Sequence, residues 1–196
     1  LPDDLNVGLV TFAGRAQTPV MPTTDHATVA RALDGATLDS ATATGDAIAA
    51  AQSAILQFGE QIQGPEGPPP AAIVLLSDGK QTIPTELDDP RGAFTAADEA
   101  AKIGLPIHAI SFGTLGGSIS VDGQVLPVPN DDESLMEIAR RTEGEFHSKL
   151  ISTKLKKTVI TLPKEAFLEG GDINFIKTEG GSYYFGGLSR SNRQGH

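Results

Sequence analysis

Two segments of the chain supply a hydroxyl and a carboxylate in a pattern typical of a hard-cation site. Residues 73–76 form an uninterrupted apolar run, and Ser77 and Asp78 follow it directly. Such a run is typical of a parallel strand that is buried on both faces, and it places Asp78 at the carboxyl end, where open α/β sheets bind ligands. The threonine-rich turn Thr42-Ala-Thr-Gly45 opens a helix of small residues that could bring a hydroxyl to the same edge. Hard cations prefer oxygen ligands, so a threonine hydroxyl and the Asp78 carboxylate at this edge would suit a divalent cation.

Local patterns predict the elements that would hold these two residues in place. A strand is expected over 5–13, a short edge piece over 18–21, and a helix from Thr24 or Asp25 to Leu33. An alanine-rich helix over 43–58 is expected to lead into the strand over 72–77. The further elements expected are a helix over 93–103, a strand over 105–112, a hairpin turning at Asp122 and Gly123, a helix from Asn130 or Asp131 to Arg141, and an edge strand over 145–147. Helices alternating with strands in this way predict an α/β fold with a mostly parallel, Rossmann-like sheet flanked by helices.

Four sequence blocks resemble successive parts of a von Willebrand factor A (VWA) domain of the bacterial, membrane-anchored type. They are Val7-Gly-Leu-Val-Thr-Phe12, Thr42-Ala-Thr-Gly-Asp-Ala-Ile48, Leu75-Leu-Ser-Asp-Gly79 and Pro106-Ile-His-Ala-Ile-Ser-Phe-Gly113. The resemblance covers residues 1–148 and implies that Thr42 and Asp78 match the threonine and second aspartate of the metal-ion-dependent adhesion site. It also implies a bound Mg²⁺ or other divalent cation and a partner protein that contributes a carboxylate to it.

One part of the family pattern is missing from this sequence. The Asp-x-Ser-x-Ser block of the central strand is absent, and the chain lacks an initiator methionine, so we expect a fragment of a longer protein. Thr42 and Asp78 alone would bind a cation only weakly. The missing strand would also leave two neighbouring strands with unpaired backbone groups, which is costly. We therefore expect these strands to close up, or another segment, such as the β-rich tail, to fill the gap.

The tail, residues 149–196, differs from the rest in charge and in pattern. Residues 1–148 carry a net charge of −14 and the tail a net charge of +4, which suggests a domain boundary near residue 148. In the tail we expect short strands over 158–162, 173–177 and 183–185, separated by Gly-Gly turns.

The tail also resembles one blade of the guanidino-group-modifying enzymes, such as dimethylargininases and arginine deiminases. The resemblance rests on Phe167-Leu-Glu-Gly-Gly-Asp-Ile173 and Phe185-Gly-Gly-Leu-Ser-Arg-Ser-Asn192. It implies substrate-binding roles for Asp172 and Arg190, with the Arg190 guanidinium gripping a substrate carboxylate. That chemistry needs a cysteine nucleophile. The chain contains no cysteine, so we predict no catalytic residue here.

Composition excludes several other functions. The net charge of −10 argues against a nucleic-acid partner, because phosphate binding needs clustered lysine and arginine. No apolar run approaches the ~18 residues that a membrane helix needs. His26 and His108 have no other ligand residue at metal-binding spacing, so we assign them packing or surface roles.

These observations lead to a protein-binding module, and not an enzyme, that uses a divalent cation to bind a partner's carboxylate. The VWA resemblance implies the extracytoplasmic side of a bacterial membrane as its location. The alternative is a fragment of a guanidino-modifying hydrolase that is not catalytically competent alone. A third possibility is that two unrelated pieces join near residue 148, where the charge and the motifs both change.

Overall fold

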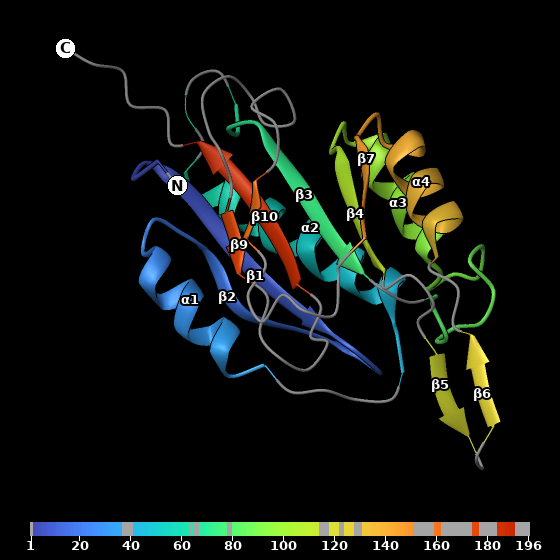
Figure 1. Cartoon of the computed structure of the whole chain (residues 1–196). Helices are drawn as coiled ribbons and strands as arrows, with labels where there is room; N and C mark the ends of the chain where they lie inside the picture. Colours follow the sequence, from blue (N-terminus) through green and yellow to red (C-terminus); the bar gives the residue numbers. More distant parts are fainter. Residues whose placement is uncertain are drawn as a thin grey trace.

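The chain folds into a mixed α/β structure built on a six-stranded sheet, shown in the computed structural model in Figure 1. The residues described are 2–36, 41–62, 64, 67–77, 80–113, 118–121, 124–127, 131–150, 159–161, 174–176 and 184–190. For residues 112–127, and after residue 148, the description is confined to the backbone.

The main sheet has the strand order β2-β1-β10-β3-β4-β7. Its strands are β1 (Leu5–Phe12), β2 (Ala16–Thr23), β3 (Ala71–Ser77), β4 (Ile107–Gly113), β7 (Phe146–Leu150) and β10 (Tyr184–Arg190). The pairs β3–β4 and β4–β7 are parallel, whereas β1 pairs antiparallel with both β2 and β10. Four strands therefore run in one direction, and β2 and β10 run in the other. This mostly parallel α/β arrangement confirms the predicted fold class.

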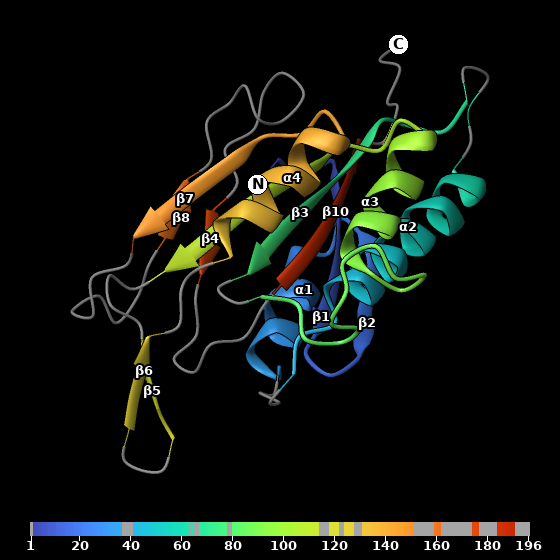
Figure 2. The same ribbon diagram turned by 90° about the vertical axis from the view of Figure 1, so that its right-hand side faces the viewer.

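Helices cover both faces of the sheet. The helices are α1 (His26–Asp34), α2 (Thr44–Gln61), α3 (Ala93–Lys102) and α4 (Asp132–Arg141). Helices α2, α3 and α4 share one large core with alternate residues of β1, β3 and β4, among them Val10, Ile73 and Ile107. Helix α1 packs against Leu9 and Val20 on the opposite face, as Figures 1 and 2 show. The opposite orientation of Leu9 and Val10 follows from the two-residue repeat of a strand.

Helix ends lie close to where capping residues predicted them. Asp25 is the N-cap of α1, and its carboxylate accepts a hydrogen bond from the Thr28 amide at 3.1 Å. Hydrogen bonds from the hydroxyl and amide of Thr28 lower the pKa of Asp25, so this cap stays ionised at neutral pH. Gly35 follows the last turn of α1, and Asp131 is the N-cap residue of α4.

Strand β10 occupies the gap that the missing central strand was expected to leave. It pairs antiparallel with β1 on one side and with β3 on the other, with Leu188 opposite both Val7 and Ala72. The predicted strand over 183–185 was therefore too short: β10 continues through Gly186 and Gly187 to Arg190. Strands β1 and β3 provide backbone hydrogen-bonding partners on both sides of β10. These hydrogen bonds outweigh the low strand propensity of the glycines.

Two small sheets complete the described strands. Strands β5 (Ser118–Val121) and β6 (Gln124–Pro127) form the predicted hairpin, which extends away from the main sheet in both views (Figures 1 and 2). Strands β8 (Val159–Thr161) and β9 (Asn174–Ile176) pair with each other. Strand β10 lies beyond residue 148 and shares a sheet with β1 and β3. The domain boundary near residue 148 stays a prediction. Among the described residues, no helix is long and apolar enough to cross a membrane.

Candidate functional site

Hydrogen bonds of its backbone amide and carbonyl groups hold Thr42 at the carboxyl edge of the sheet. Its amide donates a hydrogen bond to the Thr82 hydroxyl at 2.9 Å. Its carbonyl oxygen accepts hydrogen bonds from the amides of Thr82 and Ile83, at 2.9 and 3.2 Å. The next amide, of Ala43, donates to the Ala13 carbonyl oxygen at 2.7 Å. Thr42 is therefore fixed between the end of β1 and the loop that follows β3.

The buried side chain of Gln81 ties the start of α2 to the same loop. Gln81 is 3% exposed, and its Oε1 atom accepts a hydrogen bond from the Gly45 amide at 3.0 Å. Its Nε2 atom donates to the Pro84 carbonyl oxygen at 2.8 Å. The first amides of a helix have no partner within the helix, and the N-cap residue of α2, Ala43, supplies no side-chain acceptor. Gln81 therefore provides from a distant loop the cap that local sequence does not.

Close packing holds the loop against the first turn of α2. A Cβ atom on Gly45 would lie 2.1 Å from the Arg91 carbonyl oxygen, so only glycine permits this approach. The Arg91 guanidinium forms a two-point ion pair with the Asp46 carboxylate, which lies in the first turn of α2. The hydrogen bond and ion pair to Asp46 raise the pKa of Arg91. These contacts make the loop and the start of α2 one connected unit.

Serine hydroxyls line the carboxyl ends of three neighbouring strands. Ser77, Ser111 and Ser148 occupy one row, because Ser77 pairs with Ser111 and Ser111 pairs with Ser148. Ser111 is fully buried and donates a hydrogen bond to Asp132 in the first turn of α4. The Ser148 hydroxyl lies 3.5 Å from the other oxygen of the same carboxylate. Asp132 thus joins α4 to the edge of the sheet.

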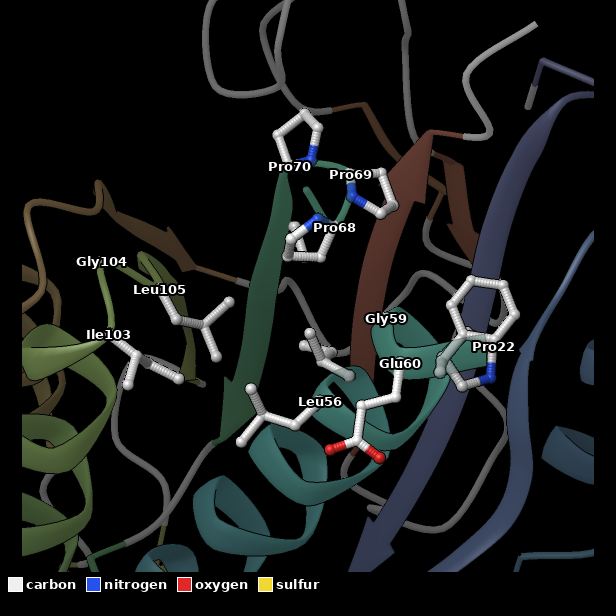
Figure 3. A pocket seen from close by; sticks show the side chains of 13 residues that line it. Pro22, Leu56, Gly59, Glu60, Pro68, Pro69, Pro70, Ile103, Gly104 and Leu105 are labelled. Carbon is white, nitrogen blue, oxygen red and sulfur yellow. The ribbon is translucent and has the colours of Figure 1, made fainter. Parts of the chain in front are cut away.

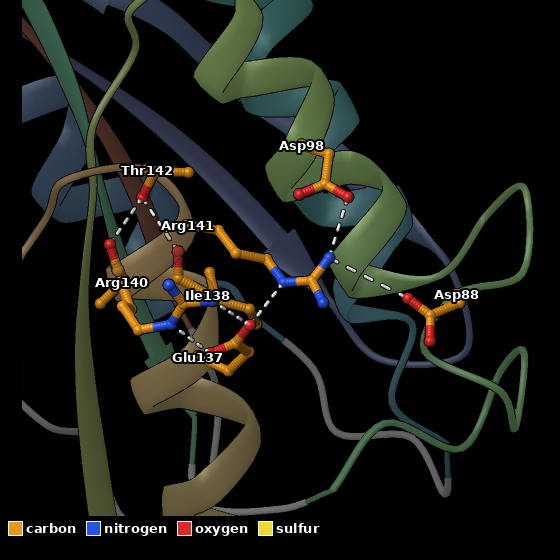
Figure 4. Close-up of polar contacts among 8 residues, drawn as sticks. Asp88, Asp98, Glu137, Ile138, Arg140, Arg141 and Thr142 are labelled. Carbon is orange, nitrogen blue, oxygen red and sulfur yellow. Dashed lines mark hydrogen bonds and ion pairs between the residues drawn. The ribbon is translucent and has the colours of Figure 1, made fainter.

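Arg141 connects α3, α4 and the loop after β3 (Figure 4). Its guanidinium donates hydrogen bonds to Glu137 and Asp98, both at 2.8 Å, and lies 4.0 Å from Asp88 on that loop. It also stacks 4.3 Å above the centre of the Phe94 ring. Hydrogen bonds from Arg140 and Arg141 lower the pKa of Glu137 to about 2, so this carboxylate stays ionised at neutral pH. The hydrogen bonds of Arg141 thus join α3 to α4.

The structure describes the four predicted site residues to different extents. Thr42 lies at the predicted edge, whereas Asp78 and Asp172 lie outside the described residues, and Arg190 is described by its backbone in β10. The fully buried Ser77 ends β3 immediately before Asp78. The convergence of Thr42 and Asp78 therefore stays a prediction. Among the described residues, no three His, Asp or Glu side chains are grouped as metal ligands would be.

The two histidines considered from sequence have structural contacts, as predicted. The Nε2 atom of His26 lies 2.8 Å from the Leu5 carbonyl oxygen. The Nδ1 atom of His108 accepts a hydrogen bond from the Glu145 amide at 3.1 Å, and burial lowers the pKa of His108. Both rings thus join neighbouring elements of the fold.

Sequence reasoning missed Gln81 and Arg91 as residues that position the site. Gln81 lies three residues after Asp78 and carries a polar side chain beside an Asp-Gly turn. Nothing local, however, shows that its partner is the amide of Gly45, 36 residues away. The same holds for Arg91 and Asp46, which are 45 residues apart.

The fold, the sequence blocks and a family profile point to the same class of protein. The profile described as von Willebrand factor type A domain matches residues 1–81. Together with the α/β fold, this match supports a VWA domain in this chain, and VWA domains are generally protein-interaction modules.

Several mycobacterial proteins are similar to this chain in sequence. The chain is 44% identical over 161 residues to the UPF0353 protein of Mycobacterium leprae (strain TN), a match that covers 82% of this chain and 48% of that protein. The UPF0353 protein of Mycobacterium tuberculosis (strain ATCC 25177 / H37Ra) is 42% identical over the same shares of the two chains. The chain thus spans about half the length of the curated relatives it matches.

Two solved structures share the fold. One is the conserved hypothetical protein BatB from Bacteroides thetaiotaomicron, with a TM-score of 0.53 and 24% identity. The other is an aerotolerance-related membrane protein from Bacteroides fragilis NCTC 9343, with a TM-score of 0.55 and 22% identity. Each match covers 74% of this chain and 71% of the other. At this level of identity, the likeness shows the fold alone.

Proposed function

We propose that this chain is a protein-binding module in which Thr42 and Asp78 help to hold a divalent cation that a partner's carboxylate completes. The proposal is supported chiefly by the position of Thr42. Three backbone hydrogen bonds fix Thr42 to Thr82 and Ile83, just after the segment that carries Asp78. Thr82 lies four residues after Asp78, so the chain between Asp78 and Thr82 spans at most about 14 Å.

The donor chemistry of the two residues suits a hard cation such as Mg²⁺. A hydroxyl and a carboxylate supply oxygen ligands, and Mg²⁺ characteristically uses few protein ligands and keeps several water molecules. Thr42 would contribute its hydroxyl, and Asp78 would contribute the negative charge. With one protein charge only, the affinity for the cation alone would be low, and a carboxylate from a partner would raise it. The cation would also let a domain with a net charge of −14 bind an acidic group.

Titration of the isotope-labelled full chain with Mn²⁺ tests the cation site without a known partner. Paramagnetic broadening of amide signals is expected first at Thr42, which is a proposed ligand, and at Ser77 and Lys80, which flank Asp78 in the chain. The variants Asp78→Asn and Thr42→Val should each weaken this broadening about tenfold, since each removes one of two protein ligands.

A matched control separates the site from general acidity. Asp88 lies on the following loop, its side chain is 80% exposed, and Asp88→Asn removes the same charge. It should leave the Mn²⁺ effect unchanged. The proposal fails if Asp78→Asn and Asp88→Asn behave alike, or if Mn²⁺ broadens exposed acidic clusters first. The carboxylate step is tested by an aspartate-containing peptide, whose binding should require Mg²⁺ and be lost with EDTA.

The proposed location is the extracytoplasmic side of a bacterial membrane. It is supported by the VWA resemblance and by the Bacteroides fragilis neighbour, which is described as a membrane protein. No observation on the described residues favours the guanidino-modifying alternative, and the chain has no cysteine for that chemistry. The roles of Asp172 and Arg190 in a substrate pocket therefore rest on sequence resemblance alone.

A further inference from the structure

An apolar groove lies at the end of the sheet opposite to Thr42. It has a volume of about 340 Å³ and is lined by the last turns of α2, the proline segment 68–70, the start of β3 and the turn after α3. Figure 3 shows Ile103 and Leu105 on one side of this groove, Leu56 and Glu60 on α2, and the three prolines above them. Thr42 precedes α2 and Ser77 ends β3, so the groove and the proposed cation site lie at opposite ends of both elements.

The walls of the groove expose large apolar side chains. Leu56 and Ile103 are each 49% exposed, and nearby Ile62 is 37% exposed. Leu105, which is 5% exposed, contributes buried apolar surface to the lining. Apolar side chains gathered around a hollow are typical of a protein-interaction site, whereas single exposed ones are common on any surface.

Backbone hydrogen bonds and prolines shape the walls of the groove. Gly104 has φ +67°, a left-handed conformation that ends α3, and its amide donates to the Ala101 carbonyl oxygen at 3.0 Å. The amide of Leu105 donates to the Ala100 carbonyl oxygen, also at 3.0 Å, and this turn holds Ile103 outward. The facing prolines have fixed φ angles. A site that is already in shape loses little conformational entropy on binding.

The charge of the groove indicates what it would bind. Glu60 is the one charged residue among the described residues that line it, and its carboxylate lies beside Leu56 (Figure 3). It forms no ion pair with another described residue. The chain as a whole carries a net charge of −10, so Glu60 and the overall charge both favour a positively charged ligand over an anionic lipid surface.

We propose that this groove binds a short amphipathic segment of a partner protein, in which a bulky apolar side chain is flanked by lysine or arginine. The apolar side chain would enter between Leu56 and Ile103, and the basic residue would meet Glu60. The volume is at the lower end of the range for binding pockets, ~300–1,000 Å³, and suits one or two large side chains. The proposal does not depend on a cation, so it stands or falls separately from the function proposed for Thr42 and Asp78.

Two synthetic amphipathic peptides with the same leucine and phenylalanine anchors, one flanked by lysines and the other by glutamates, test the proposal on the full chain. The lysine peptide should bind at least about tenfold more tightly by fluorescence anisotropy, and the preference should weaken at high salt. When this peptide is added, the chemical-shift changes of the protein's backbone amides should centre on Leu56, Gly59 and Ile103. Binding should persist in EDTA.

Exposed positions allow variants that leave the core intact. Leu56→Ser and Ile103→Ser should each weaken binding of the lysine peptide about tenfold. Met136→Ser is the matched control, because Met136 is an exposed apolar residue (52%) on α4 and does not line the groove. Glu60→Lys should reverse the preference between the peptides, and Glu86→Lys, at an exposed loop position, should not.

Several results would overturn the proposal. Equal binding of the two peptides, or equal losses in Leu56→Ser and Met136→Ser, would show that the contact is not specific to the groove. Binding to phosphatidylglycerol vesicles that Leu56→Ser abolishes would assign the surface to lipid. Self-association that is lost in Ile103→Ser would assign it to a second copy of the chain.

Discussion

Replacing Gln81 with methionine tests whether this buried amide holds the proposed site together. Gln81→Met keeps the length of the side chain but removes both polar atoms. The Gly45 amide then loses its acceptor at 3.0 Å, and the Pro84 carbonyl oxygen loses its donor at 2.8 Å. Methionine packs well in irregular interiors, so the loss of hydrogen bonds should dominate over any change in packing.

The expected loss of stability follows from those two groups. A buried polar group left without a partner costs about 1–3 kcal/mol. The Gly45 amide lies at a buried helix start and should bear the full cost, whereas the Pro84 carbonyl is only partly buried and can recruit water. We therefore expect a decrease in the free energy of unfolding of about 2–4 kcal/mol. This is a large part of the ~5–15 kcal/mol by which domains are stable.

Urea denaturation measures this decrease directly. With a slope of about 2–3 kcal/mol/M, the midpoint should fall by roughly 0.7–2 M. The matched control is Gln57→Met, an exposed position on α2, where we expect a change within about 0.5 kcal/mol. Equal midpoints for Gln81→Met and Gln57→Met would refute this account of the helix start.

Three further changes test other parts of the fold. Gly45→Ala should destabilise the chain by about 1–3 kcal/mol despite better helix propensity, because its Cβ would lie 2.1 Å from the Arg91 carbonyl oxygen; thermal unfolding measures this. Thr142→Val should leave the first amide of β4 without its acceptor at 3.0 Å, at a cost of about 1–3 kcal/mol, and should speed hydrogen exchange of that amide. Burial lowers the pKa of His108 below 6.5, so the unfolded chain binds more protons than the folded chain. Stability should therefore fall as the pH decreases below about 6.5, and His108→Asn should flatten this part of the pH profile of unfolding.

Elements whose signals are local in sequence could be predicted well. The run over 73–76 became the centre of β3, and the alternation of helix, glycine and strand correctly predicted the parallel β3–β4 pair. The predicted alanine-rich helix is α2, although it extends to Gln61 because no proline or β-branched run stops it earlier. Strand β10 was predicted poorly, since its glycines indicate a turn locally and only its two neighbours favour a strand.

The sequence suggests the residues of the candidate site but not the contacts that hold them. The pairing of Thr42 with Asp78 stays a prediction from their spacing and from the VWA resemblance. The side chains that hold Thr42 in place were not recognisable, because Thr82 lies 40 residues away in the sequence. The groove near Leu56 also escaped notice, because its walls come from separate elements and each wall resembles an ordinary helix end or loop.

The sequence by itself determined the class of fold, the approximate elements and the kind of ligand oxygen available at the edge of the sheet. These depend on the periodicity of side chains, on capping residues and on composition, all of which act over a few neighbouring residues. The tertiary structure alone decided which strand lies between β1 and β3, which amide caps α2 and where apolar side chains stay exposed. Those outcomes depend on contacts between distant residues, which form only once the whole sheet and its helices have packed.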